Sequence, residues 1–374
     1  MLRVAIVANK VTPYRVPVFQ RLSRMPDVIL HAIFCAEREP NRLWDLPSLG
    51  FNHTFLREHF ISVRGRYIHY NLDVISSLKK FAPDVVVTAG FNPTHLYAFG
   101  YAQMRGWGHV PMTDGTDASE LSLSKVHRSV RRFVYARSGA FVSASEGGQR
   151  LYRSYGIPED HCFKSCLCID NDAFSPRLQK KEKPFDFLFC GRIESVKNPL
   201  FALQVAAEVA KRLGRKTSML FVGSGSEEDR VKQAAAELSS LVSVEFKGFA
   251  AQRELPSLYG AARIFLFPTQ WDPWGVVVNE ACASGLPVIS SPHAGVTGEL
   301  VRDCENGFIC DLDVNVWADR AVILLTQEHV WNDFSRRSLA LVGGYTYDSA
   351  ARGLVEACRY SVSDHRQNAT RKAA

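Results

Sequence analysis

Residues 185–213 read FDFLFCGRIESVKNPLFALQVAAEVAKRL, and this stretch decides the fold class. The apolar run FDFLFC predicts a buried strand, and Gly191 frees the backbone to turn after it. Asn198 then has the character of a helix N-cap, with Pro199 at the first helical position. FALQVAAEVAKRL shows the apolar spacing of an amphipathic helix. The stretch is therefore a strand, a loop and a helix, the repeating unit of doubly wound α/β domains.

Short apolar runs alternate with longer helical patterns along the whole chain. Because these runs are continuously apolar, they are typical of parallel strands that helices cover on both faces. Two series of them predict an α/β protein with two doubly wound, Rossmann-like domains. The expected strands are 4–8, 28–34, 84–88, 109–112 and 140–144 in the first series, and 185–190, 218–223, 243–248, 263–268 and 286–290 in the second.

The domain boundary is expected in SPRLQKKEKP, residues 175–184, because this stretch is charged, polar and flanked by prolines. The first domain then covers residues 1–174 and the second 185–345. Residues 346–374 begin with a helical pattern that follows the second sheet and could cap either domain. The last residues, SDHRQNATRKAA, lack apolar periodicity and predict a disordered tail.

Bulk composition excludes several classes of protein. The chain has 374 residues, of which 46% are hydrophobic and 22% are charged, an ordinary globular composition. No apolar run reaches the roughly 20 residues of a transmembrane helix, and the run from Val4 to Ala8 is too short for a signal peptide. The nine cysteines are odd in number and mostly lie in apolar runs, which favours a cytosolic location. Cys162, Cys166 and Cys168 lack the fourth ligand of a zinc site and indicate a plain extended segment.

The positive charge is concentrated in the first half of the chain. Residues 1–180 contain 23 Lys and Arg against 15 Asp and Glu, whereas the remainder contains 22 against 23. The stretch KVHRSVRRFVYAR at 125–137 places an apolar stripe beside four cations, Lys125, Arg128, Arg131 and Arg132. This pattern suits an amphipathic helix on an anionic membrane surface, and equally an ordinary surface helix. Nucleic acid is not expected, because no recognised binding motif accompanies the charge.

The first half also lacks the signature of a nucleotide-binding domain. A dinucleotide site would place G-x-G-x-x-G after the first strand, yet no glycine occurs between Met1 and Gly50. Ligands of open α/β sheets bind at the carboxyl ends of the strands. In the second half of the chain, three such strand ends carry informative turns.

The first turn is CGRIESVKNPL, residues 190–200. Arg192 and Lys197 lie on a loop that leads into a helix N-terminus, where two cations repel the helix dipole unless an anion lies between them. One interpretation is solvated loop charge. The other is a diphosphate clamp, with a planar guanidinium fork from Arg192 and a point charge from Lys197.

The second turn is VGSGSEEDR, residues 222–230. Gly223 and Gly225 open the backbone, and Ser224 or Ser226 can cap the next helix. Capping alone explains this pattern, so it adds little.

The third turn is the loop PTQWDPW with the helix that starts near Gly275. The free amides of residues 275–277 can bind phosphate at the helix N-terminus. Asp272 precedes the helix and Glu280 lies about two turns into it, and carboxylates accept hydrogen bonds from sugar hydroxyls. The alternatives are a helix-start charge for Asp272 and a solvated face for Glu280, although the apolar neighbours of Glu280 suggest burial.

These motifs together resemble the retaining GT-B glycosyltransferases of the GT4 family (glycosyl transferases group 1). The resemblance is carried by GRIESVKN and by WDPWGVVVNEACASGLPVI some seventy residues later. HAGVTGELVRDCENGFIC at 293–310 and YGIPEDHCFKSCLCIDNDAF at 155–174 extend it, so that it covers about residues 140–310. Before this region the match is mainly architectural, apart from the loop TPYR near the N-terminus.

The resemblance implies two facing Rossmann-like domains with a deep cleft, a C-terminal domain that binds a UDP- or GDP-sugar, and a final helix that crosses back to the N-terminal domain. Arg192 and Lys197 would hold the diphosphate, Glu280 the ribose, and Asp272 the donor sugar. Asp272 departs from the family pattern, which usually has Glu at this position. The implied donor-binding set is Gly191, Arg192, Lys197, Ser224, Asp272, Trp274, Gly275, Val276 and Glu280, with Arg192, Lys197 and Asp272 as its catalytic part.

On the acceptor side, the candidates come from strand ends in the first half. They are Tyr14, Asn92, His95 and Asp114. No metal cofactor is expected for this type of enzyme. Asp311 and Asp313 imitate a D-x-D motif, but they follow a strand and indicate a turn.

The implied function is hexose transfer with anomeric retention onto a glycan or lipid-linked acceptor, in polysaccharide, lipopolysaccharide or glycolipid assembly at the inner face of the plasma membrane. Two alternatives remain open. A non-catalytic nucleotide-sugar binder is favoured by the Asp at 272, and an epimerase or phosphorylase would share the fold. A phosphorylase would need a pyridoxal-bearing lysine, for which the sequence has no supporting motif.

Overall fold

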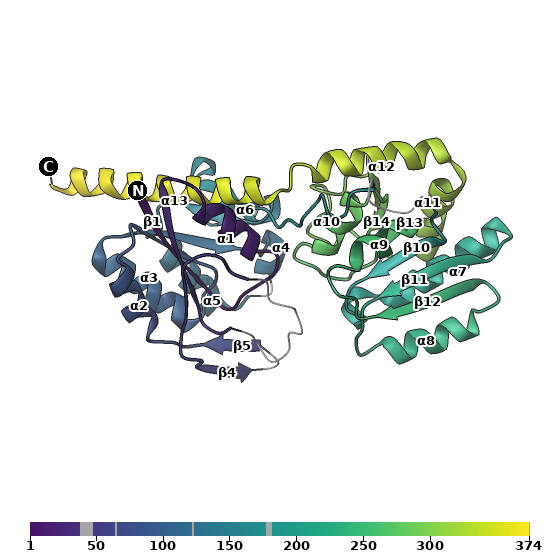
Figure 1. The fold of residues 1–374 in the computed structure, drawn as a ribbon, viewed down its shortest axis with the longest axis horizontal. Coiled ribbons are helices and arrows are strands. Elements are labelled where there is room, and N and C mark those ends of the chain that lie inside the picture. The colour runs from purple at the N-terminus through teal and green to yellow at the C-terminus, as the bar shows by residue number, and fades with distance from the viewer. Residues whose placement is uncertain (38–47, 64–65, 122, 177–181, 374) are drawn as a thin grey trace. The chain divides into compact units, whose positions relative to one another are not determined.

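The chain forms two compact α/β units. A computed structural model describes residues 1–37, 48–63, 66–121, 123–176 and 182–373. Unit 1 contains residues 1–167 and 347–374, and unit 2 contains residues 168–346 (Figure 1). Each unit is built on a parallel sheet, and all ten strands predicted from the apolar runs are present. The predicted class, α/β with two Rossmann-like domains, is confirmed.

The sheet of unit 1 has the strand order β3-β2-β1-β6-β7-β8-β9, and every described pairing in it is parallel. The chain order therefore reverses between β1 and β6. A separate antiparallel hairpin, β4 with β5, was not predicted from the sequence, because it lies outside the sheet and its strand β4 is largely exposed. The strands are β1 Leu2–Ala8, β2 Val28–Phe34, β3 His53–Phe55, β4 Phe60–Val63, β5 Arg66–His69, β6 Val85–Thr88, β7 Gly108–Thr113, β8 Phe141–Ser143 and β9 Cys162–Lys164.

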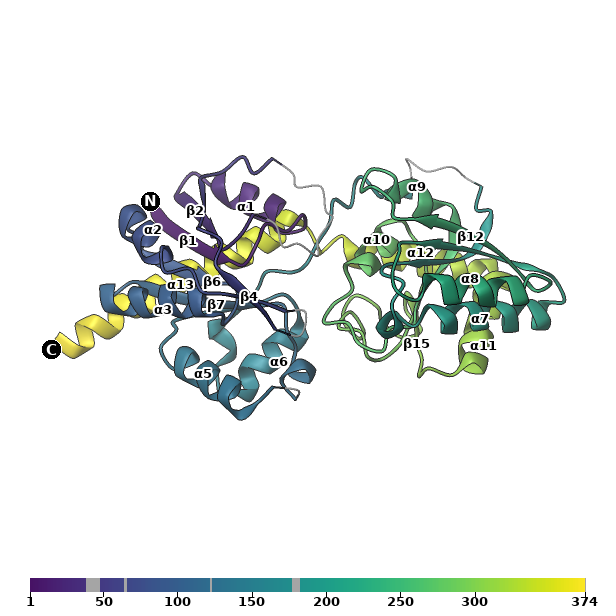
Figure 2. The same ribbon diagram turned by 90° about the horizontal axis from the view of Figure 1, so that it is seen from below.

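Helices cover both faces of the unit 1 sheet. On one face, Ala5 and Val7 of β1 pack against side chains of α2 and α3. On the opposite face lie α1 and α13, and Figure 2 shows α13 crossing β6 and β7. The helices are α1 Val16–Ser23, α2 Val74–Phe81, α3 Pro93–Arg105, α4 Asp117–Glu120, α5 Lys125–Tyr135, α6 Glu146–Ser154 and α13 Tyr347–Ala373.

The sheet of unit 2 has the order β12-β11-β10-β13-β14-β15, again parallel throughout the described pairings. This is the order of a Rossmann domain, with the reversal between β10 and β13. The strands are β10 Phe185–Cys190, β11 Thr217–Val222, β12 Val242–Gly248, β13 Ala262–Phe267, β14 Val288–Ser290 and β15 Gly307–Ile309.

The core of unit 2 follows from alternation along its strands. Phe187, Phe189, Met219 and Phe221 point to one face, where they meet the apolar sides of α7, α8 and α11. Helices α9 and α10 lie on the other face. The helices are α7 Pro199–Leu213, α8 Glu228–Glu237, α9 Leu255–Gly260, α10 Val276–Ala283, α11 Val314–Thr326 and α12 Glu328–Val342.

The division between the units falls at residues 167 and 168, before the expected linker at 175–184. Residues 177–181 of that linker lie outside the described residues. The segment before them belongs to unit 2 because it is anchored there. The Asn171 amide donates to the carbonyls of Val342 and Tyr345 at 3.0 and 3.2 Å, and the Phe174 ring meets Tyr259 edge-on.

Helix α13 runs from Tyr347 to Ala373, so its range includes the stretch where the sequence predicts a disordered tail. The tail lacks apolar periodicity, but from Leu354 onward it contains no glycine or proline, and several of its residues are good helix formers. A helix can therefore extend beyond the part that packs on unit 1.

Gly353 sets how closely α13 approaches unit 1. A Cβ at this position would stand 1.9 Å from the carbonyl oxygen of Lys164. We expect Gly353→Ala to lower the free energy of unfolding by roughly 2–4 kcal/mol, because neither backbone can yield. Urea denaturation and limited proteolysis would measure this. Gly100→Ala is the matched control: that helical glycine has no described heavy atom within 4 Å, so alanine should be neutral or stabilising. Equal stability of the two variants would contradict the prediction.

Candidate functional site

The strongest candidate site lies in unit 2, at the carboxyl ends of β10 and β13. These neighbouring strands flank the reversal of strand order, where open α/β sheets bind ligands. The loop after β10 carries Arg192 and Lys197, and the loop after β13 carries Asp272. The two loops are joined, because the Gln270 amide donates to the Val196 carbonyl at 2.8 Å.

The loop after β10 is held against the loop after β11 by direct backbone contact. A Cβ at Gly223 would lie 2.0 Å from the Gly191 carbonyl oxygen, and a Cβ at Gly225 would lie 2.3 Å from that of Ile193. The Ile193 amide donates to the Ser224 carbonyl at 2.9 Å. Both Gly223 and Gly225 are therefore required for this approach.

Of the two helix starts predicted here, one is confirmed and the other is wrong. Asn198 is the N-cap residue of α7, with Pro199 in the first turn, although its backbone is left-handed (φ 57°) and its side chain makes no capping hydrogen bond within the described residues. Asn198 also ends a 3₁₀ turn, Ser195–Lys197, that sequence periodicity does not reveal. Ser224 and Ser226 do not cap α8, because the N-cap residue is Glu227.

The two cations of the loop have different environments. Arg192 is exposed and pairs with Glu194 at 2.7 Å. The Lys197 side chain is only 14% exposed, and its Nζ donates to the Asp272 carboxylate at 2.5 Å. Lys197 thus approaches the loop after β13, whereas Arg192 extends into solvent. The interpretation as solvated loop charge therefore fits Arg192 but not Lys197.

Hydrogen bonds hold both the side chain and the backbone of Asp272 in place. One carboxylate oxygen accepts from Lys197, and the other accepts from the Trp274 amide at 3.0 Å. Its own backbone pairs with the segment around Ala294, where the Gly295 amide donates to the Asp272 carbonyl at 2.9 Å. The carboxylate therefore cannot swing freely toward a ligand, and it offsets the charge of Lys197.

The helix N-terminus expected near Gly275 is present. Gly275 has φ 101° and precedes α10, and a Cβ there would lie 2.7 Å from the Phe267 ring. Val276 is half-buried in the first turn. Trp274 directly precedes Gly275. It is 1% exposed, and its indole donates to Asn279 at 2.8 Å, so its side chain fills the core.

Glu280 is buried in α10, which excludes the solvated-face interpretation. Its Oε2 accepts from the Tyr259 hydroxyl at 2.7 Å. Burial raises the pKa of the Glu280 carboxyl to about 7, and the hydrogen bond from Tyr259 opposes this rise. The same burial holds the pKa of Cys190, beside this pair, well above its usual value.

In unit 1, the acceptor-side candidates come from strand ends of one sheet and form two contacts. Asp114, after β7, pairs with Arg15 at 2.5 Å, and Arg15 also donates to the Ser165 carbonyl at 3.0 Å. Asn92, after β6, donates to the Asn9 side chain at 3.0 Å. Tyr14 is half-buried in the loop before α1. We call this set the carboxyl edge of unit 1.

His95 lies in the first turn of α3 and is 1% exposed. A contact with the Val7 backbone favours the charged form of its ring. Burial lowers the pKa of His95 to about 3, so the ring is neutral at physiological pH. A neutral imidazole here can donate or accept a hydrogen bond, but it is a poor base.

The basic helix expected at 125–137 is α5, with one correction. Lys125, Arg128 and Arg132 are exposed, as a surface-binding helix requires. Arg131 points inward instead, where it forms an ion pair with Glu120 and lies over the Phe91 ring. Glu120, on the neighbouring α4, attracts it, so three of the four predicted cations face outward.

Within the described ranges, no group of three His, Cys, Asp or Glu side chains is arranged to hold a metal ion. Asp313 caps α11 by accepting from the Asn315 and Val316 amides, which confirms that Asp311 and Asp313 belong to a turn. In the same part of the chain, no helix is long and apolar enough to cross a bilayer.

The chain is similar to known glycosyltransferases. Residues 170–338 match the family model of glycosyl transferases group 1. The D-inositol 3-phosphate glycosyltransferase of Frankia alni is 30% identical over 184 residues, which are 47% of this chain and 45% of that protein. The amylovoran biosynthesis glycosyltransferase AmsK of Erwinia amylovora is 25% identical over 253 residues, 63% of this chain and 60% of that protein. The chain thus spans about half the length of these curated relatives.

Similarity in three dimensions extends further. The crystal structure of Anabaena Alr3699/HepE in complex with UDP aligns with a TM-score of 0.75, covering 95% of this chain and 99% of that one. Sequence identity is 14%, so the likeness concerns the fold. The two Rossmann-like units therefore have the GT-B architecture of glycosyltransferases.

Sequence reasoning missed the partners of the candidate residues. Glu194, Arg15 and Tyr259 each contact a candidate, yet none was assigned a role. Arg15 was visible as the arginine of TPYR. Tyr259 gave no signal, because it reaches Glu280 from α9, and only the tertiary fold brings the two helices together.

The pKa of Glu280 predicts a pH-dependent stability. Because its folded pKa exceeds the ordinary value of 4.5, its contribution is complete below about pH 4.5 and is lost as pH rises through about 7. Relative to Glu280→Gln, the wild type should lose up to about 3 kcal/mol across this window. Urea unfolding at a series of pH values would measure it. Parallel pH profiles for the two chains would refute the assignment, and Tyr259→Phe should move the loss to higher pH.

Proposed function

We propose that this protein is a glycosyltransferase that moves a hexose from a UDP- or GDP-sugar to a glycan or lipid-linked acceptor, with retention of anomeric configuration. The observation that carries the proposal is the gathering of Lys197, Asp272, Glu280 and the α10 N-terminus at the reversal point of the unit 2 sheet. A nucleotide-sugar contains an anionic diphosphate between two hydroxylated groups, and this site offers complementary groups in that order.

In this proposal the cations and the α10 amides bind the diphosphate. Arg192 is exposed and can turn from Glu194 toward a phosphate, whereas Lys197 is already ordered by Asp272. As the glycosidic bond breaks, negative charge grows on the leaving phosphate, and these preorganised donors stabilise it. No metal is required for this task, because the chain itself supplies the positive charge.

The two carboxylates have different roles in the proposal. Glu280, ordered by Tyr259, binds the ribose hydroxyls, and Asp272 contacts the donor sugar from a position fixed by Lys197. Aspartate is one methylene shorter than the glutamate that the family usually has here. The donor sugar must therefore lie closer to the backbone of residue 272 to make the same contact with the carboxylate. Gly191 and Ser224 supply the loop backbone, Gly275 and Val276 the phosphate-facing amides.

The acceptor in this proposal binds at the carboxyl edge of unit 1. Asn92, Asp114 and Tyr14 offer polar groups. His95 is a further candidate with a neutral imidazole, although only 1% of it is exposed. The likeness to AmsK, named for amylovoran biosynthesis, supports a role in polysaccharide assembly. The likeness to a UDP-bound structure supports a nucleotide-sugar donor.

We also place the protein at the cytoplasmic face of a membrane. The exposed cations Lys125, Arg128 and Arg132 on α5 support contact with anionic lipid headgroups. A lipid-linked acceptor would be found at such a surface.

One observation favours a second candidate function. Asp272 and Lys197 form an ion pair with each other, so a ligand that contacts either side chain would have to compete with this ion pair. A nucleotide-sugar-binding protein without transfer activity would tolerate this. Slow hydrolysis of bound nucleotide-sugar, assayed over a panel of UDP- and GDP-sugars, separates the enzyme from the silent binder.

Loss of the clamp should abolish donor binding. Arg192→Ala with Lys197→Ala removes both phosphate contacts, and we expect affinity for the best nucleotide-sugar to fall at least roughly a hundredfold. Isothermal titration calorimetry measures this. The control is Arg230→Ala with Lys232→Ala, which removes two exposed cations from nearby α8. Undiminished binding in the clamp variant would show that the diphosphate lies elsewhere.

Activity should not depend on a divalent ion. Treatment with EDTA followed by desalting is expected to leave donor hydrolysis and transfer within about twofold of the untreated rate, because protein groups supply the positive charge. Adding back Mg²⁺ or Mn²⁺ provides the comparison. Restoration of a lost activity by either ion would contradict the metal-independent mechanism.

A further inference from the structure

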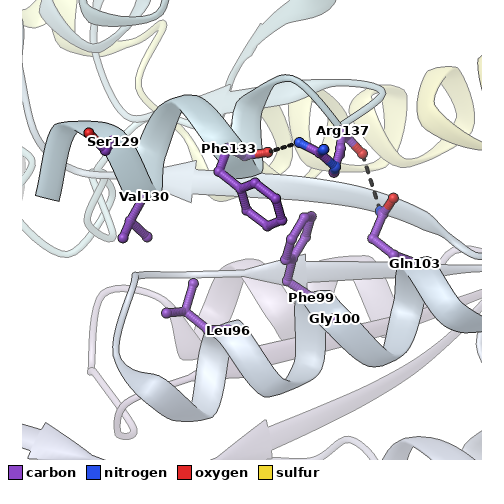
Figure 3. A pocket seen from close by; sticks show the side chains of 8 residues that line it. All are labelled: Leu96, Phe99, Gly100, Gln103, Ser129, Val130, Phe133 and Arg137. Carbon is purple, nitrogen blue, oxygen red and sulfur yellow. Dashed lines mark hydrogen bonds between the residues drawn. The ribbon is translucent and has the colours of Figure 1, made fainter. Parts of the chain in front are cut away.

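A groove lies between α3 and α5 on unit 1, with a volume of about 520 Å³. Figure 3 shows its two walls, with Leu96 and Phe99 of α3 directed toward Val130 and Phe133 of α5. It belongs neither to the unit 2 site nor to the residues of the carboxyl edge. The lining residues are Leu96, Phe99, Gly100, Gln103, Ser129, Val130, Phe133 and Arg137.

The interior of the groove is apolar and incompletely filled. The rings of Phe99 and Phe133 meet edge-on, with centroids 6.0 Å apart, yet Phe133 remains 54% exposed. Beside them, Gly100 presents bare backbone, since an added Cβ would have no described heavy atom within 4 Å. Two helices that packed fully would not leave this space.

The end of the groove at Arg137 carries positive charge. The Arg137 guanidinium lies 4.1 Å from the centroid of the Phe133 ring and donates to the Phe133 carbonyl at 3.1 Å. Gln103 of α3 donates to the Arg137 carbonyl at 3.2 Å, which joins the two walls. The cation thus lies at the mouth of an apolar slot.

The surroundings of the groove are cationic and apolar together. Within α3 and α5, which are described in full, there is no aspartate or glutamate. Lys125, Arg128 and Arg132 are exposed on α5. Two large apolar side chains, Val126 of α5 and Met104 of α3, are 71% and 83% exposed. Soluble surfaces seldom combine exposed large apolar groups with several exposed cations in this way.

We propose that the α3–α5 groove receives one acyl chain of an anionic bilayer lipid, whose headgroup binds the cations around it. The proposal deepens the membrane contact of the proposed function and rests on it. A bilayer supplies negative charge and hydrocarbon at the same surface, which matches both properties of this face. A second copy fits poorly, because a two-fold interface would bring the same cations together without counter-charge.

The decisive variant fills the groove without altering any charge. Gly100→Leu places a side chain in the slot and raises helix propensity, so the fold should be kept. Ala340→Leu, on the exposed face of α12 in unit 2, adds the same side chain away from the groove and serves as the control. Flotation with vesicles of phosphatidylcholine, with and without phosphatidylglycerol, measures binding.

We expect the wild type and Ala340→Leu to bind the vesicles that contain phosphatidylglycerol, and Gly100→Leu to bind roughly tenfold more weakly. Arg128→Gln with Arg132→Gln should weaken binding at low salt, since these cations face the headgroups. A Phe133→Trp reporter tests insertion directly. Its fluorescence should be quenched by phosphatidylglycerol with brominated acyl chains, and Gly100→Leu should remove that quenching.

Three results would overturn the proposal. Equal vesicle binding by Gly100→Leu and Ala340→Leu, with unchanged quenching, would mean that the cations adsorb to headgroups and the groove stays empty. Equal binding to vesicles of phosphatidylcholine alone would exclude an anionic lipid. Self-association that Gly100→Leu abolishes in sedimentation would identify a second copy as the occupant. Nucleotide-sugar binding is measured on the same variants. Its absence would contradict the proposed transferase function, whereas the vesicle results concern the groove alone.

Discussion

The unit 2 site depends on a backbone contact that only glycine permits. Gly223 and Gly225 lie directly against the carbonyl oxygens of Gly191 and Ile193, so that the loops after β10 and β11 are in backbone contact. Arg192 and Lys197 lie on the loop after β10, so their positions depend on this contact. A side chain at either glycine would need the space that a carbonyl already fills, and the loop would have to withdraw from its neighbours. The position of both cations therefore follows from two residues that carry no chemistry of their own.

Charge is distributed within the site by burial. Lys197 and Asp272 are both largely covered and neutralise each other, whereas Arg192 remains in solvent with Glu194. Glu280 is buried beside the Tyr259 hydroxyl, and this burial raises the pKa of its carboxyl. An arriving diphosphate would change the balance most for Lys197, because its carboxylate partner is already bound. The ion pair thus preorganises the cation and also competes with a ligand.

The sheet of unit 1 has the same kind of strand-order reversal as the sheet of unit 2, but different side chains lie at its strand ends. At its own reversal point, Asn9 meets Asn92, and one strand further along Arg15 meets Asp114. Helix α3 connects this edge to the groove. Its first turn holds His95 in the buried interior, and the residues that follow, Leu96 onward, form one wall of the slot. A single helix therefore joins a polar strand edge to an apolar, cation-rimmed surface.

Periodicity and local chemistry alone determined the α/β class, all ten main strands and the burial of Glu280, because runs that are apolar on both faces have few other solutions. The loops that carry Arg192, Lys197 and Asp272 were also predictable, since a strand end and a helix start are local features. Only the tertiary structure decided which groups meet. Tyr259 reaches Glu280, Asp114 pairs with Arg15, Arg131 turns inward to Glu120, and Trp274 is buried. Each outcome depends on how separate helices and loops pack together, which local pattern does not show. The sequence pattern shows which face of a helix or strand is apolar. Which side chains pair with one another depends on their distance in the folded chain.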